Sequence, residues 1–261
     1  MNQPARGRLV LMPNTLDFGC LAEGRQPPDL RKVIPMEALE MAAKLRHWAA
    51  ENAKTTRAFL KRVDVVCPLH TPLQAQEIAV LPRPLKGASH SVFRPADWDA
   101  LLAPALAGHD LGLISEAGLP GVADPGALLV LAAHRHGIAV LPLSGPSSLV
   151  LAMAGSGLNG QSFAFVGYLP TDSTQRMQRI RELEALSRKQ GQTQLVIETP
   201  YRNAALAQAL IQTLQPETLL SMSLGLTLED GWCRTRAVAQ WRQQAPTLPD
   251  HIPAVFAWLA S

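Results

Sequence analysis

The stretch SEAGLPGVADPG, residues 115–126, has the composition of a loop that holds a ligand. It follows the apolar run LGLI and contains three glycines, two prolines and two carboxylates in twelve positions. Glycine permits backbone conformations and close approaches that other residues do not, and binding loops often use such positions. An ordinary tight connection into the helix ALLVLAAHR accounts for the same residues, so the loop alone leaves both interpretations open.

A second stretch, ENAKTTR, supplies the candidate catalytic residues Glu51, Lys54 and Arg57. If the segment is helical, its three-residue spacing places Lys54 and Arg57 on one face. Basic side chains bind phosphates, and a neighbouring carboxylate can steer or deprotonate a hydroxyl. The alternative is that Glu51 and Lys54 form an ordinary surface pair of small energetic consequence.

The charge distribution around this stretch favours an anionic partner. Between Lys44 and Arg62 there are six basic residues and a single acid. The whole chain, with a formal charge of +3 and a pI near 8.9, is too mildly basic to indicate nucleic acid by itself. A solvated helix face is the alternative explanation of the basic run.

Several other chemistries lack their residues. The chain has no GxxxxGK(S/T) phosphate loop, no HExxH, no GxSxG and no CxxC spacing among its cysteines, so we expect neither a metal site nor a disulfide framework. GSGLNG, residues 155–160, matches the dinucleotide pattern. A predicted helix precedes it and a predicted strand follows, which is the reverse of what that fingerprint requires. We interpret these glycines as a helix stop and a linker.

The elements that position the candidate loops alternate between strand and helix. Apolar runs over residues 8–13, 45–51, 76–82, 111–116 and 138–143 predict strands, and PGALLVLAAHRHG predicts a helix between the last two. Such alternation is typical of an α/β fold with a parallel sheet covered on both faces. Ligands bind beyond the carboxyl ends of such strands, so MPNT, ENAKTTR, SEAGLPG and LSGPSS should lie along one rim.

A second α/β series begins after Gly157. SFAFVGYLP, TQLVIETP and three later runs predict strands, with helices over about residues 173–189 and over NAALAQALIQTL. The last three strands follow one another without long crossovers, which favours antiparallel pairing. The predicted organisation is an N-terminal α/β domain with a parallel sheet over residues 1–157 and a C-terminal α/β domain with a mixed sheet over residues 158–261.

Nothing in the sequence indicates export or a membrane span. No apolar run approaches the ~20 residues of a membrane-spanning helix, and the amino-terminal run is too short for a signal-peptide core. The separated Cys20, Cys67 and Cys233 fit a reducing compartment. We therefore expect a cytoplasmic protein.

The motifs in this order resemble the tetrapyrrole methylase superfamily, in particular its branch of 16S rRNA ribose 2'-O-methyltransferases. ISEAGLPGVADPG, LSGPSS and FAFVGYLP are similar to that branch's SDAGTP, SDPG, PGPSA and FxGFLP patterns. ENAKTTRAFL is similar to its EDTRxTRKLL, and IETPYR to its YESPHR. The similarity extends from about Leu9 to Thr227.

The resemblance implies a methyltransferase that binds S-adenosylmethionine between two α/β domains, usually as a homodimer, and that needs no metal. An apolar helix surface around LVLAMAG also favours a dimer. Asp124 is expected to cap or brace its loop. Carried over residue by residue, the resemblance assigns cofactor contacts to Met12, Pro13, Ser115, Glu116, Ala117, Gly118, Ser147, Ser148, Glu198, Leu226 and Thr227.

The departures from the family pattern concern the substrate more than the cofactor. MPNT, with Asn14, replaces the family's TPIGN, and the Asp and Arg of EDTR become Asn52 and Lys54. Three functional classes remain open. They are an RNA methyltransferase, which the basic run favours, a methyltransferase for a small molecule such as a tetrapyrrole, and a non-catalytic module that binds S-adenosylmethionine.

Overall fold

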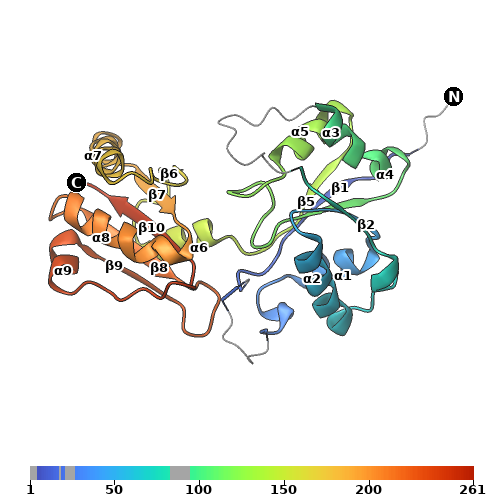
Figure 1. The fold of residues 1–261 in the computed structure, drawn as a ribbon, viewed down its shortest axis with the longest axis horizontal. Helices are drawn as coiled ribbons and strands as arrows, with labels where there is room; N and C mark the ends of the chain where they lie inside the picture. Colours follow the sequence, from blue (N-terminus) through green and yellow to red (C-terminus); the bar gives the residue numbers. More distant parts are fainter. Residues whose placement is uncertain (1–4, 18, 21–26, 83–94) are drawn as a thin grey trace. The chain divides into compact units, whose positions relative to one another are not determined.

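The chain folds into two compact units, each built around its own sheet (Figure 1). A computed structural model describes residues 5–17, 19–20, 27–82 and 95–261. Of these, residues 5–15, 27–82 and 95–146 form the first unit, and residues 16–17, 19–20 and 147–261 form the second. Each unit is described by itself.

The sheet of the first unit is parallel throughout its described strands. The strands lie in the order β3-β2-β4-β1-β5, and each falls within an apolar run predicted to be a strand. Their bounds are β1 (Leu9–Met12), β2 (His47–Ala50), β3 (Glu77–Val80), β4 (Leu111–Ile114) and β5 (Val140–Pro142). The register pairs both Met12 and Ala50 with Ile114, so β1, β4 and β2 end level with one another.

Helices cover both faces of this sheet (Figure 1). Their bounds are α1 (Met36–Lys44), α2 (Ala53–Val66), α3 (Pro95–Leu101), α4 (Ala103–Leu106) and α5 (Ala127–Arg135), with 3-10 turns at Leu30–Lys32 (η1) and Leu73–Ala75 (η2). α1 and α2 pack against Val10 and Met12, whereas α3 and α5 pack against Leu9. Successive strand residues point to opposite faces, so an uninterrupted apolar run is what a sheet buried on both sides requires.

The sheet of the second unit is mixed, as the sequence predicted. Its spatial order is β6-β7-β10-β8-β9, with β6 parallel to β7 and antiparallel pairing between the remaining neighbours. The bounds are β6 (Phe163–Phe165), β7 (Thr193–Ile197), β8 (Leu219–Leu224), β9 (Trp232–Ala237) and β10 (Ala254–Leu259).

The helices of the second unit also divide between two faces. They are α6 (Ser148–Ser156), α7 (Ser173–Gln190), α8 (Asn203–Thr213) and α9 (Val238–Gln243), with a 3-10 turn at Pro200–Arg202 (η3). α7, α8 and α9 pack with Phe256 and Trp258, and α6 packs with Val255 and Ala257 on the other face. The sequence did not predict α9. Its Trp241 is buried and donates from Nε1 to the Leu220 carbonyl at 2.8 Å, so tertiary contact explains this short helix.

Helix α6 groups with the second unit. The compact units divide between Pro146 and Ser147, because Leu149, Ala152 and Met153 of α6 pack on the second sheet. The predicted division at residue 157 lies at the other end of this helix, where Gly157 adopts a φ of +69° and ends it. The context of GSGLNG is a helix followed by a strand, so the dinucleotide fingerprint is excluded here.

Among the described helices, none combines the length and the apolar character that crossing a membrane requires. Cys20, Cys67 and Cys233 are all free thiols.

Candidate functional site

Residues that directly follow β1, β2 and β4, here called the carboxyl edge, bring together predicted site residues from three loops. Pro13 follows β1, Glu51 follows β2 and Ser115 follows β4, and these strands are neighbours in the sheet. The Glu51 amide continues the pairing by donating to the Ile114 carbonyl at 3.1 Å. Three of the four loops expected along one rim therefore meet within the first unit.

Asn14 fixes the position of residues 115–118 at this edge. Its backbone exchanges hydrogen bonds of 2.8 and 3.2 Å with Gly118 in an antiparallel bridge. Its side-chain Nδ2 donates to the carbonyls of Ser115 and Glu116 at 3.0 and 3.1 Å. The sequence identified Asn14 only as a departure from the family pattern. In the structure this buried amide ties the first loop to the SEAG loop.

The glycines of residues 115–126 adopt conformations that other residues rarely adopt. Gly118, Gly121 and Gly126 have φ values of +65°, +80° and +129°, and Ala123 is at +63° despite its side chain. Left-handed conformations of this kind are nearly free for glycine and strained for most other residues. The composition of the loop is therefore explained by its backbone path, and Ala123 holds strain directly beside Asp124.

Carboxylates gather at the carboxyl edge. The amide of Glu116 donates to Glu51 Oε2 at 3.0 Å, which places two acidic residues in contact. Burial, and next the negative charge of Glu51, raises the pKa of Asp124 to about 7, against the opposing effect of a hydrogen bond with the Ser115 side chain. Burial, the larger of the two causes, disfavours the charged carboxylate by itself, and the charge of Glu51 adds a negative potential at this edge. A hydrogen-bond donor beside these acids is therefore stabilised.

One oxygen of this acidic group has no partner. Among the described residues, Glu116 Oε1 is buried and accepts no hydrogen bond. Leaving a buried acceptor unsatisfied costs about 1–3 kcal/mol, more for a charged group, unless a ligand supplies the donor. The neighbouring Ser115 hydroxyl is engaged locally, because its single proton has two acceptors in this loop, Asp124 and the Ala117 carbonyl at 3.1 Å.

Lys54 and Arg57 lie on the first turns of α2, directly after Glu51. Asn52 caps this helix, since its side chain accepts a hydrogen bond from the Lys54 amide at 2.9 Å. Asn52 therefore caps the helix by accepting a backbone hydrogen bond, as an aspartate at the same position would. Both basic side chains are exposed.

The remaining predicted cofactor residues belong to the second unit. Glu198 follows β7, and Leu226 and Thr227 follow β8, at the edge where β10 begins between those two strands. Thr227 is exposed at a φ of +75°, a genuine outlier for a β-branched residue. Ser147 and Ser148 begin α6, and Leu226 packs against the apolar cluster that includes this helix.

Glu198 uses both of its carboxylate oxygens within its own loop. Oε1 accepts from the amide and the hydroxyl of Thr199, and Oε2 pairs with the Arg202 guanidinium at 3.0 Å. This buried carboxylate therefore holds the turn after β7.

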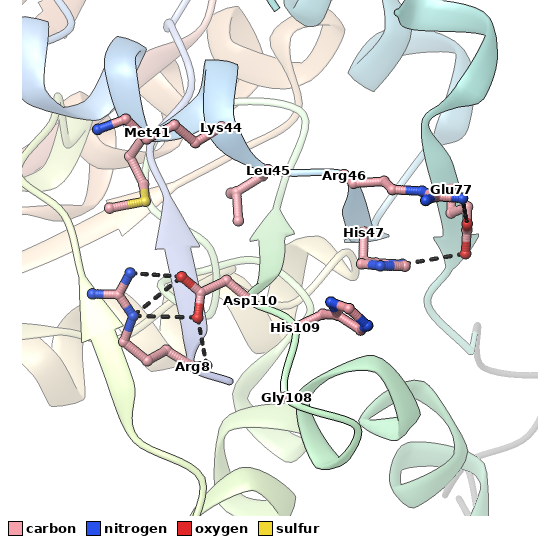
Figure 2. A pocket seen from close by; sticks show the side chains of 10 residues that line it. All are labelled: Arg8, Met41, Lys44, Leu45, Arg46, His47, Glu77, Gly108, His109 and Asp110. Carbon is pink, nitrogen blue, oxygen red and sulfur yellow. Dashed lines mark hydrogen bonds and ion pairs between the residues drawn. The ribbon is translucent and has the colours of Figure 1, made fainter. Parts of the chain in front are cut away.

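The sequence missed a second group of polar residues at the opposite edge of the first sheet. A pocket there, here called the amino-edge pocket, is lined by Arg8, His47, Glu77, His109 and Asp110, among others (Figure 2). These residues are spread over a hundred positions and match no motif. The available signal was that each one precedes or begins a strand of the same parallel sheet.

No family model matches the chain, but curated proteins named ribosomal RNA small subunit methyltransferase I are similar to it. The chain is 31% identical to the one from Mesorhizobium japonicum over 194 residues, 74% of this chain and 59% of that protein. It is 37% identical to the one from Halalkalibacterium halodurans over 169 residues, 65% of this chain and 51% of that protein. The chain thus spans little more than half the length of these relatives.

Solved structures of tetrapyrrole methyltransferases share the fold. The methyltransferase CobJ matches 98% of this chain with a TM-score of 0.56 at 13% identity, over all of its own length. Uroporphyrin-III C-methyltransferase from Thermus thermophilus, in complex with S-adenosylhomocysteine, matches 97% of both chains with a TM-score of 0.53 at 16% identity. The predicted two-domain α/β fold is confirmed. The chain is similar to the ribosomal RNA methyltransferases in sequence and to the tetrapyrrole methyltransferases in fold.

Proposed function

We propose that the chain is an S-adenosylmethionine-dependent methyltransferase that acts on RNA, with a ribose 2'-hydroxyl of ribosomal RNA as the acceptor. The observation that carries the proposal is the carboxyl edge. There a half-buried loop with several positive φ values meets an acidic group that includes an unpartnered oxygen. The names of the curated relatives support methyl transfer to ribosomal RNA, and the S-adenosylhomocysteine of one solved neighbour supports the cofactor.

The residues of the carboxyl edge fit this cofactor. The unpartnered Glu116 Oε1 suits a ribose hydroxyl or an ammonium group, both of which donate hydrogen bonds. The charge of Glu51, which adds to the effect of burial on the pKa of Asp124, suits a positively charged sulfonium. Met12, Pro13, Ser115, Ala117 and Gly118 would supply the backbone and apolar wall of this part of the site.

When bound, S-adenosylmethionine supplies an electrophilic methyl group, so the protein has to align the acceptor and exclude water. Lys54 and Arg57, exposed on one face of α2, would hold a phosphate of the RNA strand. Glu51 would orient the acceptor hydroxyl. Asp124, whose pKa lies near neutrality, is the residue best able to take up its proton, a role that the sequence did not assign.

The second unit carries the remaining residues that are proposed for cofactor binding. Thr227 is held at a positive φ, and strain of this kind clusters at ligand-binding positions. Ser147, Ser148 and Leu226 are proposed as cofactor contacts. Glu198 is better explained as a positioning residue, since both of its oxygens are already engaged.

We also propose a homodimer. Val150 and Leu151 of α6 are 60% and 38% exposed, an apolar surface that a second copy would cover. Light scattering at tens of micromolar should give twice the mass of the chain, and a monomer would contradict the proposal. Action on ribosomal RNA would also place the protein in the cytoplasm, where its free thiols remain reduced.

The decisive experiment supplies the protein with labelled S-adenosylmethionine and ribosomal RNA from cells that lack the gene. We expect the label in one ribose of the small-subunit RNA. Mass analysis should find the same modification missing in those cells and present in the parent. Methylation of a tetrapyrrole instead would assign a small-molecule acceptor. Cofactor binding without transfer to either acceptor would identify the protein as a non-catalytic module that binds S-adenosylmethionine.

A further inference from the structure

The segment that forms β9 and α9 combines arginine and tryptophan without acidic residues. Residues 231–249 contain three arginines and two tryptophans but no aspartate or glutamate. Successive side chains of a strand point to opposite faces, so Trp232, Arg234 and Arg236 of β9 share one face of the second sheet, each about 7 Å from the next. These three residues are here called the arginine face.

The arginine face lies along an edge of its sheet. Among the described strands, β9 pairs with β8 on one side and has no strand on the other (Figure 1). Each residue of the arginine face lies opposite a buried leucine or methionine of β8. The face is therefore a charged border beside the apolar core of the second unit.

Tryptophan rings hold both arginines in place. The Arg234 guanidinium lies 4.8 Å from the ring centre of Trp232, and that of Arg236 lies 5.0 Å from the ring centre of the buried Trp241 of α9. Arg236 Nη1 also donates to Gln244 Oε1 at 3.3 Å. Cation–π pairs occur roughly once per 70–80 residues, whereas both of those found among the described residues belong to this one strand.

Two of the three arginines keep donors available for a ligand. In the described part of the chain the Arg234 guanidinium has no hydrogen bond or ion pair, and this residue is exposed. Arg236 uses one of its donors at Gln244. Arg242 instead donates to the carbonyls of Ile211 and Leu214 and stabilises the end of α8.

The chemistry of the arginine face matches an unpaired nucleic-acid strand. A guanidinium pairs with phosphate through its N–H groups, and its planar face stacks on an unpaired base. A duplex hides its bases in the helix, so it uses only the charge. Addition of a peptide strand to β9 is disfavoured, because charged side chains on an edge strand discourage such pairing.

We propose that the arginine face binds a single strand of RNA. The inference rests on the proposed function and assigns to its substrate a surface on the second unit, in addition to Lys54 and Arg57 on the first. The hairpin that joins β8 to β9 includes Thr227. An RNA strand along β9 therefore has one end beside a residue that is proposed for cofactor binding.

The test measures fluorescence anisotropy of a labelled uridine RNA of about 12 nucleotides, a length that one nucleic-acid-binding module covers. Arg234→Ala and Arg236→Ala should each weaken binding by about fivefold or more and reduce the log–log salt slope by about 0.7, the value for one phosphate of a single strand. Arg181→Ala removes an exposed arginine from α7 of the same unit and should leave both unchanged. An unchanged melting temperature shows that each variant is folded.

A conservative variant separates stacking from charge. Arg234→Lys keeps the positive charge but has no planar group to stack on a base. It should retain the wild-type salt slope and weaken RNA binding by about threefold. Wild-type affinity in Arg234→Lys would overturn the base-stacking role. Polyglutamate of the same length carries charge without bases, so the wild type should bind it at least about tenfold more weakly than the RNA.

The results also separate this proposal from the proposed function. Wild-type RNA affinity in both alanine variants, or no saturable RNA binding by the wild type, overturns the arginine face as an RNA site. Equal affinity for polyglutamate assigns the face to an acidic peptide and overturns it as well. Methyl transfer to ribosomal RNA by the wild type, measured in parallel, decides the proposed function by itself. Weakened RNA binding in the alanine variants supports the arginine face even if no methyl group is transferred.

Discussion

The two edges of the first sheet hold their acids differently. The carboxyl edge gathers Glu51, Glu116 and Asp124 beside a strained backbone, and among the described residues Glu116 Oε1 has no partner. In the amino-edge pocket both acids are paired, Asp110 with Arg8 and Glu77 with Arg46. β2 separates the edges by only four residues, roughly 13 Å at the rise of an extended strand.

The separation of the two edges divides the basic run of the sequence into two. Lys44 and Arg46 precede β2 and line the amino-edge pocket, whereas Lys54 and Arg57 follow β2 on α2. Residues that are close in a sequence lie at opposite ends of a sheet when a strand runs between them. A local excess of charge therefore does not define a single surface.

The largest expected effect at the carboxyl edge is that of Gly118→Val. Gly118 has a φ of +65°, and a β-branched side chain is strained there while also occupying the space of a ligand. We expect S-adenosylhomocysteine affinity to fall by at least about 100-fold, or roughly 2.7 kcal/mol. Calorimetry measures this loss.

Gly191→Val is the matched control for backbone strain. Gly191 has a φ of +60°, ends α7 in the second unit and has nothing within 4 Å of an added Cβ. We expect a comparable loss of stability with unchanged affinity. If both variants lose binding equally, strain alone explains the effect and the loop has no special role.

Removing the unpartnered acid at the carboxyl edge should have the next largest effect. Glu116→Ala deletes the buried acceptor Oε1 and should weaken S-adenosylhomocysteine binding by about tenfold, the loss expected for one charged hydrogen bond. Glu40→Ala, an exposed acid on α1, is the control. Wild-type affinity in Glu116→Ala would exclude this oxygen as a ligand.

The acidity of the carboxyl edge also predicts how stability depends on pH. The pKa of Asp124 in the folded state, about 7, lies above the ordinary value of 3.8, so the folded chain holds this proton more tightly than the unfolded chain. The contribution is fully present below the ordinary pKa and is lost as pH rises through 7. Wild-type stability should therefore fall across this range.

Asp124→Asn removes that loss. We expect the variant to exceed the wild type by about 1–2 kcal/mol in the free energy of unfolding at pH 8.5, a modest gain because solvent reaches part of this carboxyl. Urea unfolding at pH 5 and at pH 8.5 measures the difference, with Glu217→Gln as an exposed control. An identical pH dependence in wild type and Asp124→Asn would refute the cause assigned here.

The smallest expected effect concerns the two basic residues that follow β2 on α2. Lys54→Ala and Arg57→Ala should each reduce the salt dependence of RNA binding by about one unit of log–log slope, with unchanged cofactor affinity. Filter binding over a salt series measures the slope. Wild-type slopes together with full methyl transfer would place the acceptor elsewhere.

Much of this architecture follows from local sequence patterns. Short apolar runs predicted most of the described strands, since burial on both faces favours uninterrupted apolar residues. β9, at the edge of its sheet, is half-buried and includes charged residues, yet the segment WCRTRAV was also predicted to be a strand. α9 escaped prediction because it depends on the burial of Trp241. The loop after β4 was identified by its glycines, whose positive φ values explain their presence.

The sequence could not predict what depends on packing across the sheet. The raised pKa of Asp124 results from burial and from Glu51, which lies 73 positions away. The amide of Asn14 bridges to the SEAG loop over a separation of 101 and 102 positions. The amino-edge pocket assembles residues from the starts of separate strands, and no local pattern marks that convergence.

The central claim is that the chain binds S-adenosylmethionine, and calorimetry with S-adenosylhomocysteine tests it most directly. We predict saturable binding to the wild-type protein with a Kd in the micromolar range, about −8 kcal/mol. NAD and ATP at the same concentration should give no heat. Saturable binding of NAD or ATP with no response to S-adenosylhomocysteine or S-adenosylmethionine, by protein whose melting transition is intact, would contradict the account.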